Sequence, residues 1–364
     1  MKRYFLSSLL LLPFFFTNMA SAQDTLDKYL SSHAYPIDMK DPGGGPGCSI
    51  LAGKLGGYRV IMLGEGGSHE LEFYFDLRST LLEQLNKRLG VHSFVMEYGS
   101  ALAVLLNRYL ETGDTGCLPP IAHPGFMRFL RELYIYDHSP ATLQPIRTVG
   151  LDFERTGTYF KALRLLMPSS PAPEPIKNEI EMIKNSSDSM DCDALIRIDK
   201  YLKHSLEEKQ PAYVQYLGRS YTAVSDIITN PGLCNSRLKN RNFHLVERFE
   251  HFDSQYRDSI YFCELGEAHV NFILKNASWL LDMDKNSPFF HRVAVINVYC
   301  DNCETPVEKV SNWSFGSLQK DIESRFLPYC RSDFTLFDLT ASDDPAIGRF
   351  AASGQFLLIV KGLH

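Results

Sequence analysis

Apolar and polar positions alternate along the chain in segments that are typical of strands and helices. Short apolar runs that predict strands occupy residues 59–63, 92–96, 147–151, 259–263, 292–298, 334–339 and 356–360. Helical periodicity separates them, as in residues 70–89, where a stripe of apolar positions runs up to Gly90 and that glycine predicts the helix end. Further helices are predicted at 101–110, 124–136, 158–166 and 271–281. The alternation predicts an α/β fold, with a central parallel or mixed sheet flanked by helices.

The middle of the chain has a different pattern. Residues 168–175 are rich in proline and serine, residues 179–228 read as helices interrupted by polar loops, and 238–252 as one more helix. We therefore expect a single domain over residues 23–364, with a helical insertion at about 168–258 that is placed to cover a site. Residues 41–47 read as a loop before the first strong strand.

The first 22 residues match a secretory signal. Lys2 and Arg3 precede an apolar stretch at 5–16, and Ala20-Ser21-Ala22 is a small-residue cleavage site. The prediction is a secreted or periplasmic protein, and a retained anchor helix is the alternative. No later run approaches the roughly 20 apolar residues that a membrane helix needs, so no membrane span is expected in the mature chain.

Charge and cysteines narrow the class of protein. The net charge is −6 and no long basic run is present, which argues against nucleic acid as a partner. Eight cysteines in an exported chain favour structural disulfides. Cys192 and Cys234 flank a helical stretch, and a disulfide between them could hold its two ends together. The spacing of Cys300 and Cys303 also suits a zinc half-site or a redox pair. Cys263 lies inside a predicted core strand, and we expect it to be a buried free thiol.

Acids and histidines follow the predicted strands. Glu65, Glu97, Asp152 and Glu267 come at or just after the ends of four apolar runs, and each of the outer two is followed by a histidine, His69 and His269. In open α/β sheets the carboxyl ends of the strands form the edge where ligands bind. These residues therefore predict a hydrolytic or metal-assisted site at that edge.

Each residue type has a role that its chemistry suits. A histidine titrates near neutrality and can take a proton from water, and a neighbouring carboxylate can orient the ring. We expect His69, Glu65, Glu97, His269 and Glu267 as catalytic residues of a metal-free site, and a small molecule as substrate. The same set of ligands would also suit a divalent metal, and a histidine would suit haem.

The expected substrate-binding residues are Asp152, Arg78, Ser68 and His123. Two of them have a structural role as the alternative. Arg78 could instead pair with Asp76, and His123 could be a structural residue at a helix start. Ser68 lacks the GxSxG setting that a nucleophilic serine on an α/β-hydrolase sheet requires.

The same segments resemble the erythromycin esterase family. The matching blocks are residues 63–65, 72–73 and 81–82, then Glu97, 150–154, 241–247 and 267–269. The resemblance implies a metal-independent hydrolase in which a histidine activates water against an ester, with glutamates assisting. By position it assigns such roles to Glu65, Glu97 and His269. Wider relatives of this fold include haem-binding lipoproteins and Tiki-type metalloproteases.

One position departs from the family pattern. The first family histidine comes three residues after the glutamate, where this chain has Ser68, and His69 follows one residue later. Either His69 takes the role or the chain is a catalytically altered relative. A haem- or metal-binding protein and a divalent-metal hydrolase are the other functional hypotheses.

Overall fold

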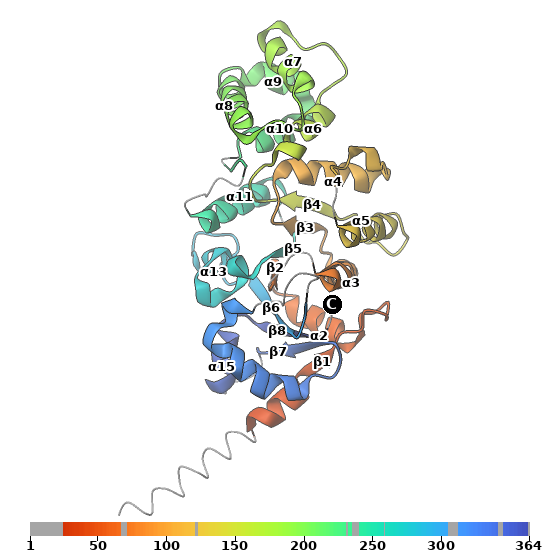
Figure 1. Cartoon of the computed structure of the whole chain (residues 1–364), viewed down its shortest axis with the longest axis vertical. Helices are drawn as coiled ribbons and strands as arrows, with labels where there is room; N and C mark the ends of the chain where they lie inside the picture. Colours follow the sequence, from red (N-terminus) through yellow and green to blue (C-terminus); the bar gives the residue numbers. More distant parts are fainter. Residues whose placement is uncertain are drawn as a thin grey trace, which may run out of the picture.

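An eight-stranded mixed sheet organises the fold, with the strand order β1-β7-β8-β6-β2-β5-β3-β4 (Figure 1). The computed structural model describes residues 25–66, 71–120, 123–230, 232–234, 240–257, 259–304, 312–340 and 345–362. The strands are β1 (Ala34–Pro36), β2 (Val60–Glu65), β3 (Ser93–Met96), β4 (Arg147–Gly150), β5 (Tyr261–Gly266), β6 (Val293–Asp301), β7 (Phe334–Asp338) and β8 (Phe356–Lys361). The prediction of an α/β fold with a parallel or mixed sheet is confirmed.

Parallel pairing brings the predicted strand ends together. β2 lies between β5 and β6, β3 lies between β5 and β4, and β6 pairs with β8, all in parallel register. Among the described strands, the antiparallel pairs are β7 with β8 and β1 with β7, at one edge of the sheet. All six residues of β2 are buried, as expected for a central strand covered on both faces.

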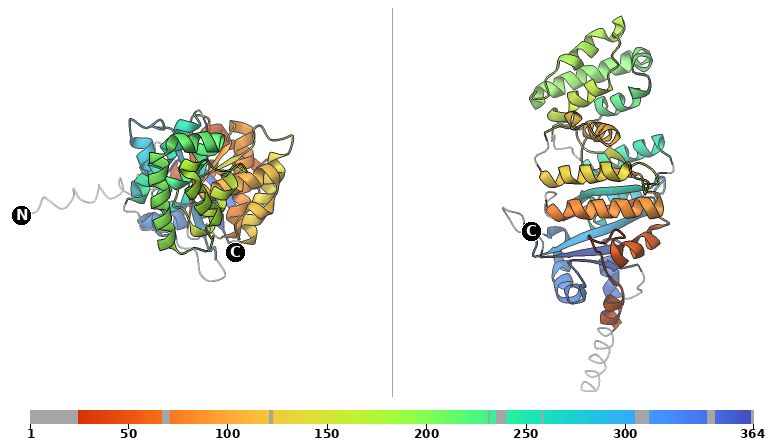
Figure 2. Two further views of the ribbon diagram at one scale, coloured as in Figure 1. Left: turned by 90° about the horizontal axis from the view of Figure 1, so that it is seen from above. Right: turned by 90° about the vertical axis from the view of Figure 1, so that its right-hand side faces the viewer.

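Helices cover both faces of the sheet. The α-helices are α2 (Gly45–Leu55), α3 (Glu72–Leu89), α4 (Ser100–Thr112), α5 (Pro124–Asp137), α6 (Thr156–Leu166), α7 (Lys177–Asn185), α8 (Cys192–Glu208), α9 (Gln210–Leu217), α10 (Tyr221–Ile228), α11 (Arg241–Gln255), α12 (Glu267–Val270), α13 (Ala277–Met283), α14 (Gln319–Asp321) and α15 (Pro345–Ala351). Ile61 and Leu63 of β2 pack with α2, α3 and α5, whereas Val60 and Met62 pack with α11 and α13. This alternation is the period of two that a strand imposes. Figure 2 shows α3 and α5 lying side by side across the face of the sheet that they cover.

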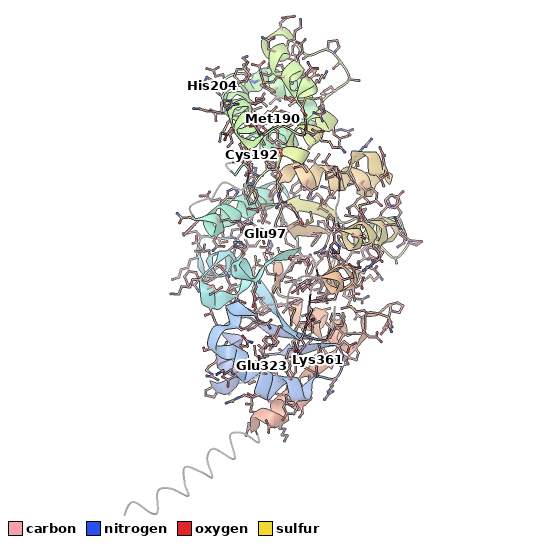
Figure 3. The ribbon with its side chains drawn as sticks, viewed as in Figure 1. Glu97, Met190, Cys192, His204, Glu323 and Lys361 are labelled. Atoms are coloured by element: carbon pink, nitrogen blue, oxygen red, sulfur yellow. A yellow bond between two sulfur atoms is a disulfide. The ribbon has the colours of Figure 1, made fainter. Side chains whose placement is uncertain are left out.

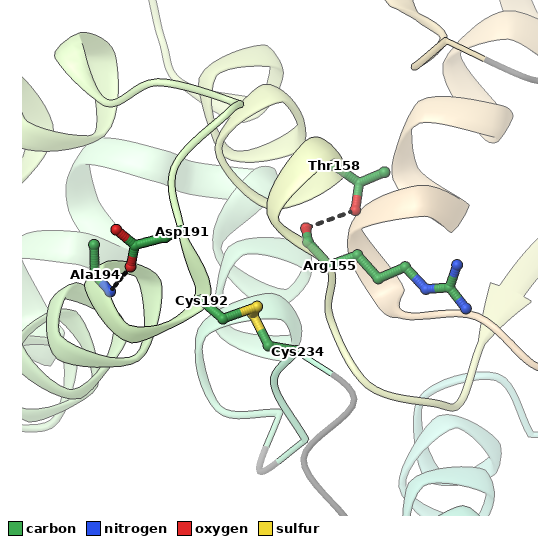
Figure 4. The surroundings of a disulfide bond; sticks show 6 residues. All are labelled: Arg155, Thr158, Asp191, Cys192, Ala194 and Cys234. Carbon is green, nitrogen blue, oxygen red and sulfur yellow. Dashed lines mark hydrogen bonds between the residues drawn. A yellow bond between two sulfur atoms is a disulfide. The ribbon is translucent and has the colours of Figure 1, made fainter.

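A group of helices extends the molecule beyond the β4 edge (Figures 1 and 2). Helices α6 to α10 share a core with α4 that is separate from the sheet cores. The Cys192–Cys234 disulfide ties the start of α8 to the segment that follows α10, and Asp191 caps α8 by accepting from the Ala194 amide (Figure 4). α11 falls inside the predicted insertion at 168–258 but packs against α13 and the sheet. The domain bounds stay a prediction.

Two local predictions are wrong. The expected helix over 271–281 is a 3-10 turn, η4 (Phe272–Leu274), followed by α13, because Lys275 takes a left-handed φ of 48° between them. The Asn276 side chain stabilises this break by donating to the carbonyls of Ala268 and Asn271. The expected loop at 41–47 ends earlier, since α2 already begins at Gly45 with Pro46 in its first turn.

The sequence also carried predictions about the N-terminus, membrane spans and cysteines. The predicted signal peptide at 1–22 lies outside the described residues. None of the helices in the described part of the chain combines the length and apolar character required to cross a membrane. The Cys192–Cys234 pair is confirmed as a disulfide, and Cys263 is confirmed as a buried free thiol. Cys48, Cys117, Cys300 and Cys330 are likewise not in a disulfide.

Candidate functional site

The candidate site lies at the carboxyl ends of β2, β5, β3 and β4. Glu65, the last residue of β2, is in register with Gly266 at the end of β5, and Glu267 begins α12 directly after it. Glu97 follows β3, whose Met96 is in register with both Glu264 and Gly150. Figure 3 places Glu97 near the middle of the long axis of the molecule.

Glu97 and Asp152 are joined by one arginine from α11. Arg241 donates through Nη2 to Glu97 Oε1 and to Asp152 Oδ2, both at 2.6 Å, and through Nε to Asp152 Oδ1 at 3.1 Å. The other oxygen of Glu97 accepts from the Gly266 amide at 2.6 Å. Burial lowers the pKa of Arg241, but the two carboxylates outweigh it and raise that pKa overall. The guanidinium thus holds the two acids side by side and offsets part of their charge.

His269 faces this acidic pair from α12. Its Nε2 lies 3.7 Å from Glu97 Oε1, and its Nδ1 lies 2.6 Å from the side-chain oxygen of Asn242. An amide oxygen only accepts, so this contact assigns the proton of a neutral ring to Nδ1. Nε2 is then the nitrogen that can accept a proton, and a proton on it would face the Glu97 carboxylate.

Glu65 belongs to a second buried group on the α3 side of the sheet. Arg78 donates through Nε to Glu264 Oε2 and through Nη2 to Glu65 Oε1, the latter at 3.2 Å. The guanidinium also lies over the rings of Phe75 and Phe129. Burial raises the pKa of Glu264 well above its usual value, and the neighbouring Glu65 raises it further, while Arg78 opposes both.

The Glu267 carboxyl group lies beside the residue that follows β2. Asn271 and Ser314 lie beside its carboxyl group, and burial raises its pKa to about 7. The Gly66 backbone lies close to it, since a Cβ added at Gly66 would be 3.5 Å from Glu267 Oε2. The buried hydroxyl of Tyr74 holds this segment by accepting from the Gly66 amide and donating to the Gly66 carbonyl, at 2.8 and 3.1 Å.

The predicted site residues therefore separate into groups. Glu97, Asp152 and His269 come together, Glu65 pairs with Arg78, and Glu267 lies next to Gly66. The alternative pairing of Arg78 with Asp76 is wrong, because Asp76 pairs with Arg128 at 2.6 Å. Ser68 and His69 lie outside the described residues. The catalytic and binding roles stay predictions.

His123 has the contacts of a structural residue. It precedes α5, where its Nδ1 accepts from the Gly125 amide at 3.1 Å, and its ring packs on Phe75 with 4.7 Å between ring centres. Its Nδ1 is also 3.8 Å from Glu72 Oε2. A substrate-binding role for His123 is a prediction that these contacts leave without direct support.

Three polar partners were not predicted as site residues. Arg241 and Asn242 belong to the block 241–247 that carries part of the family resemblance, and this block was the available signal for them. Glu264 comes directly after the apolar run 259–263 and two residues before Gly266. An acid at that position needs a buried counter-charge, which Arg78 supplies.

Metal ligation was an open alternative for these acids and histidines. Over the part of the chain that the structure describes, no group of three or more His, Cys, Asp or Glu is arranged to hold a metal ion. Cys300 and Cys303 belong to no such group of three within those residues.

Comparison with known proteins gives a likeness of fold. No protein-family model and no curated protein matches the chain. A solved structure from Bacillus cereus matches with a TM-score of 0.60 at 15% identity, covering 94% of this chain and 98% of that one. A succinoglycan biosynthesis protein matches with a TM-score of 0.61 at 14% identity, covering 94% and 97%.

The third match bears on the predicted resemblance. A mutant of the erythromycin esterase EreC in its open conformation has a TM-score of 0.58 at 13% identity, covering 87% of this chain and 93% of that one. The class defined by the fold is thus that of α/β proteins with a mixed sheet and an attached helical group. The chain shares this fold with an erythromycin esterase, which supports the resemblance at the level of the fold.

Proposed function

We propose that the chain is an exported hydrolase of the erythromycin-esterase type, in which His269 activates water for attack on an ester bond. The observation that carries the proposal is the contact of His269 with Glu97 and Asn242 at the carboxyl edge of the sheet. The shared fold with EreC, a protein named as an erythromycin esterase, adds support from outside the chain.

The proposed chemistry follows from the two ring nitrogens. Asn242 fixes the tautomer by accepting from Nδ1, so Nε2 takes a proton from water as the oxygen attacks the ester carbonyl. The imidazolium that forms lies against Glu97 Oε1, whose negative charge stabilises it. Arg241 keeps Glu97 in place, since it links that carboxylate to Asp152 on the next strand.

His69 is the other histidine in the proposal. It follows Glu65 in the sequence and would act as the partner acid or as the water-activating base itself. Glu65 is anchored by Arg78 at the end of β2, one residue before the Gly66 segment that Tyr74 holds. We propose export because of the leader-like sequence at 1–22, and the Cys192–Cys234 disulfide is consistent with an oxidising compartment.

The test is turnover of a panel of carboxylic esters, from p-nitrophenyl acetate to macrocyclic lactones. The wild-type chain should hydrolyse at least one member, and His269→Asn should reduce kcat at least about 100-fold, the loss typical of a missing general base. His204→Asn is the matched control, because this histidine lies on α8 with 68% of its side chain exposed (Figure 3). Equal turnover in the two variants would contradict the role of His269.

A further inference from the structure

Cys300 and Cys303 lie together at the end of β6, and the site described above does not use them. Their exposed fractions are 3% and 1%, and both belong to the core between the sheet and α3. Cys300 is in register with Val360 of β8. Asn302, with a left-handed φ of 55°, lets the chain turn so that Cys303 Sγ comes within 3.7 Å of the Val360 carbonyl oxygen. Both side chains therefore lie against one residue of β8, and the two thiols contact each other.

The Cys300 thiol also contacts the end of β2 through Tyr74. The Tyr74 hydroxyl interacts with this thiol and with both backbone groups of Gly66. Gly66 follows Glu65 directly. A chemical change at Cys300 thus takes place one side chain away from the strand end that carries a candidate site residue.

We propose that Cys300 and Cys303 form an oxidisable pair, which closes to a second disulfide under oxidising conditions and is linked through Tyr74 to the end of β2. In the reaction the two S–H bonds break and one S–S bond forms. The two electrons and two protons pass to an oxidant of the disulfide class, such as oxidised glutathione, whose own S–S bond breaks to give two thiols. The disulfide between Cys192 and Cys234 fits exposure of the chain to such an oxidant.

Burial determines when the pair can close. The contact with Cys303 raises the pKa of the Cys300 thiol well above its usual value, and burial raises it further. Thiolate is the form that attacks a disulfide, so the folded dithiol reacts slowly. During folding both thiols are solvated, and the bond forms before the core excludes the oxidant.

The experiment measures the redox state of one peptide. Full-length protein is reduced and denatured, then refolded in glutathione buffers of increasing oxidising strength, quenched with acid and alkylated. Tryptic peptide 293–309 contains Cys300 and Cys303 and no other cysteine. The expected product in the oxidising buffers is this peptide with neither cysteine alkylated and a mass about 2 Da below the dithiol.

Two controls make the result specific. Cys263, a buried free thiol on β5, should stay alkylatable in every buffer. In the Cys303→Ser variant, Cys300 should be alkylated or carry one glutathione. A sample kept folded throughout should oxidise at least about tenfold more slowly than the refolding sample, because its thiols are buried.

The outcomes decide both parts of the proposal. Alkylation of both cysteines in all refolding buffers, or linkage of either one to another cysteine, would overturn the pair. The link to β2 is tested by amide hydrogen exchange at Gly66 in the oxidised and reduced forms. A change of about threefold or more supports the link, and equal rates would remove it. Neither measurement needs a substrate, so both are independent of hydrolase activity.

Discussion

Glu97 provides the sharpest test of the site, because one of its oxygens lies opposite the proton-accepting nitrogen of His269. The change is Glu97→Gln, which removes the negative charge and keeps the side-chain shape. The separation between Glu97 Oε1 and His269 Nε2 is 3.7 Å, and 15% of the Glu97 side chain is exposed. We expect the variant to lose catalytic rate because its imidazolium would face a neutral amide.

The magnitude follows from that distance. Two unit charges at 3.7 Å attract by about 4 kcal/mol at an effective dielectric near 20, and by about 2 kcal/mol near 40. Partial burial of Glu97 favours this range over the value in bulk water. Since about 1.4 kcal/mol corresponds to a factor of ten in rate, Glu97→Gln should lower kcat by roughly 30- to 1,000-fold.

The assay is steady-state hydrolysis of whichever ester the wild-type chain accepts, measured from about pH 5 to pH 9. His204→Asn is again the control, because this histidine is exposed on α8 and lies outside the candidate site. Thermal melts establish that both variants fold. A loss of less than about threefold in Glu97→Gln, or an equal loss in His204→Asn, would refute the electrostatic role.

Three stability predictions follow from other parts of the molecule. Replacing both Cys192 and Cys234 with serine should lower the free energy of unfolding by about 4 kcal/mol, because the disulfide joins residues 42 apart and restricts the unfolded chain. Urea denaturation measures this loss, and an unchanged midpoint would contradict the prediction. Burial raises the pKa of the fully buried Glu154 from 4.5 to about 7. Between these pH values the folded state keeps a proton that the unfolded state has lost. The free energy of unfolding should therefore fall by about 3 kcal/mol as the pH rises from 4.5 to 7. Glu154→Gln should flatten that part of the pH profile, and an identical slope in both proteins would show that other groups cause it. Arg78→Met should cost about 3 to 5 kcal/mol by leaving buried Glu264 without its counter-charge, whereas the double change with Glu264→Gln should recover part of the loss in the same urea assay.

The strands could be predicted because their signal is local. Each central strand is an apolar run bounded by polar or turn residues, and parallel pairing then fixes where its end must lie. The acids after those runs were therefore found at one edge of the sheet. The break between η4 and α13 was not predictable from periodicity, because it depends on hydrogen bonds of the Asn276 side chain to the backbone.

The partners of the acids depend on tertiary structure. Arg241 lies 89 residues from Asp152 and 144 from Glu97 in sequence, and reaches both because α11 packs across the sheet. No local pattern specifies that approach. The same is true of Asn242 and His269, which are 27 residues apart and meet only after α11 and α12 are placed.

The alternation of side chains along the strands explains why the acids form two groups rather than one. Glu65 continues the face of Ile61 and Leu63, and Glu264 continues that of Phe262, so both point toward α3 and Arg78. Glu97, two residues after Val95, falls on the opposite face, where α11 supplies Arg241.

Each group thus contains two carboxyl groups and one guanidinium, but their surroundings differ. The Arg78 group is closed within the core, where burial raises the pKa of Glu264 while Arg78 opposes that shift. The Arg241 side chain is 33% exposed, and next to its two acids stands a histidine that can gain a proton. The excess negative charge of such a group can stabilise a histidine cation only where a proton from solvent or substrate can reach the histidine. For that reason the Arg241 group, and not the more buried Arg78 group, has the electrostatics that general-base catalysis by His269 requires.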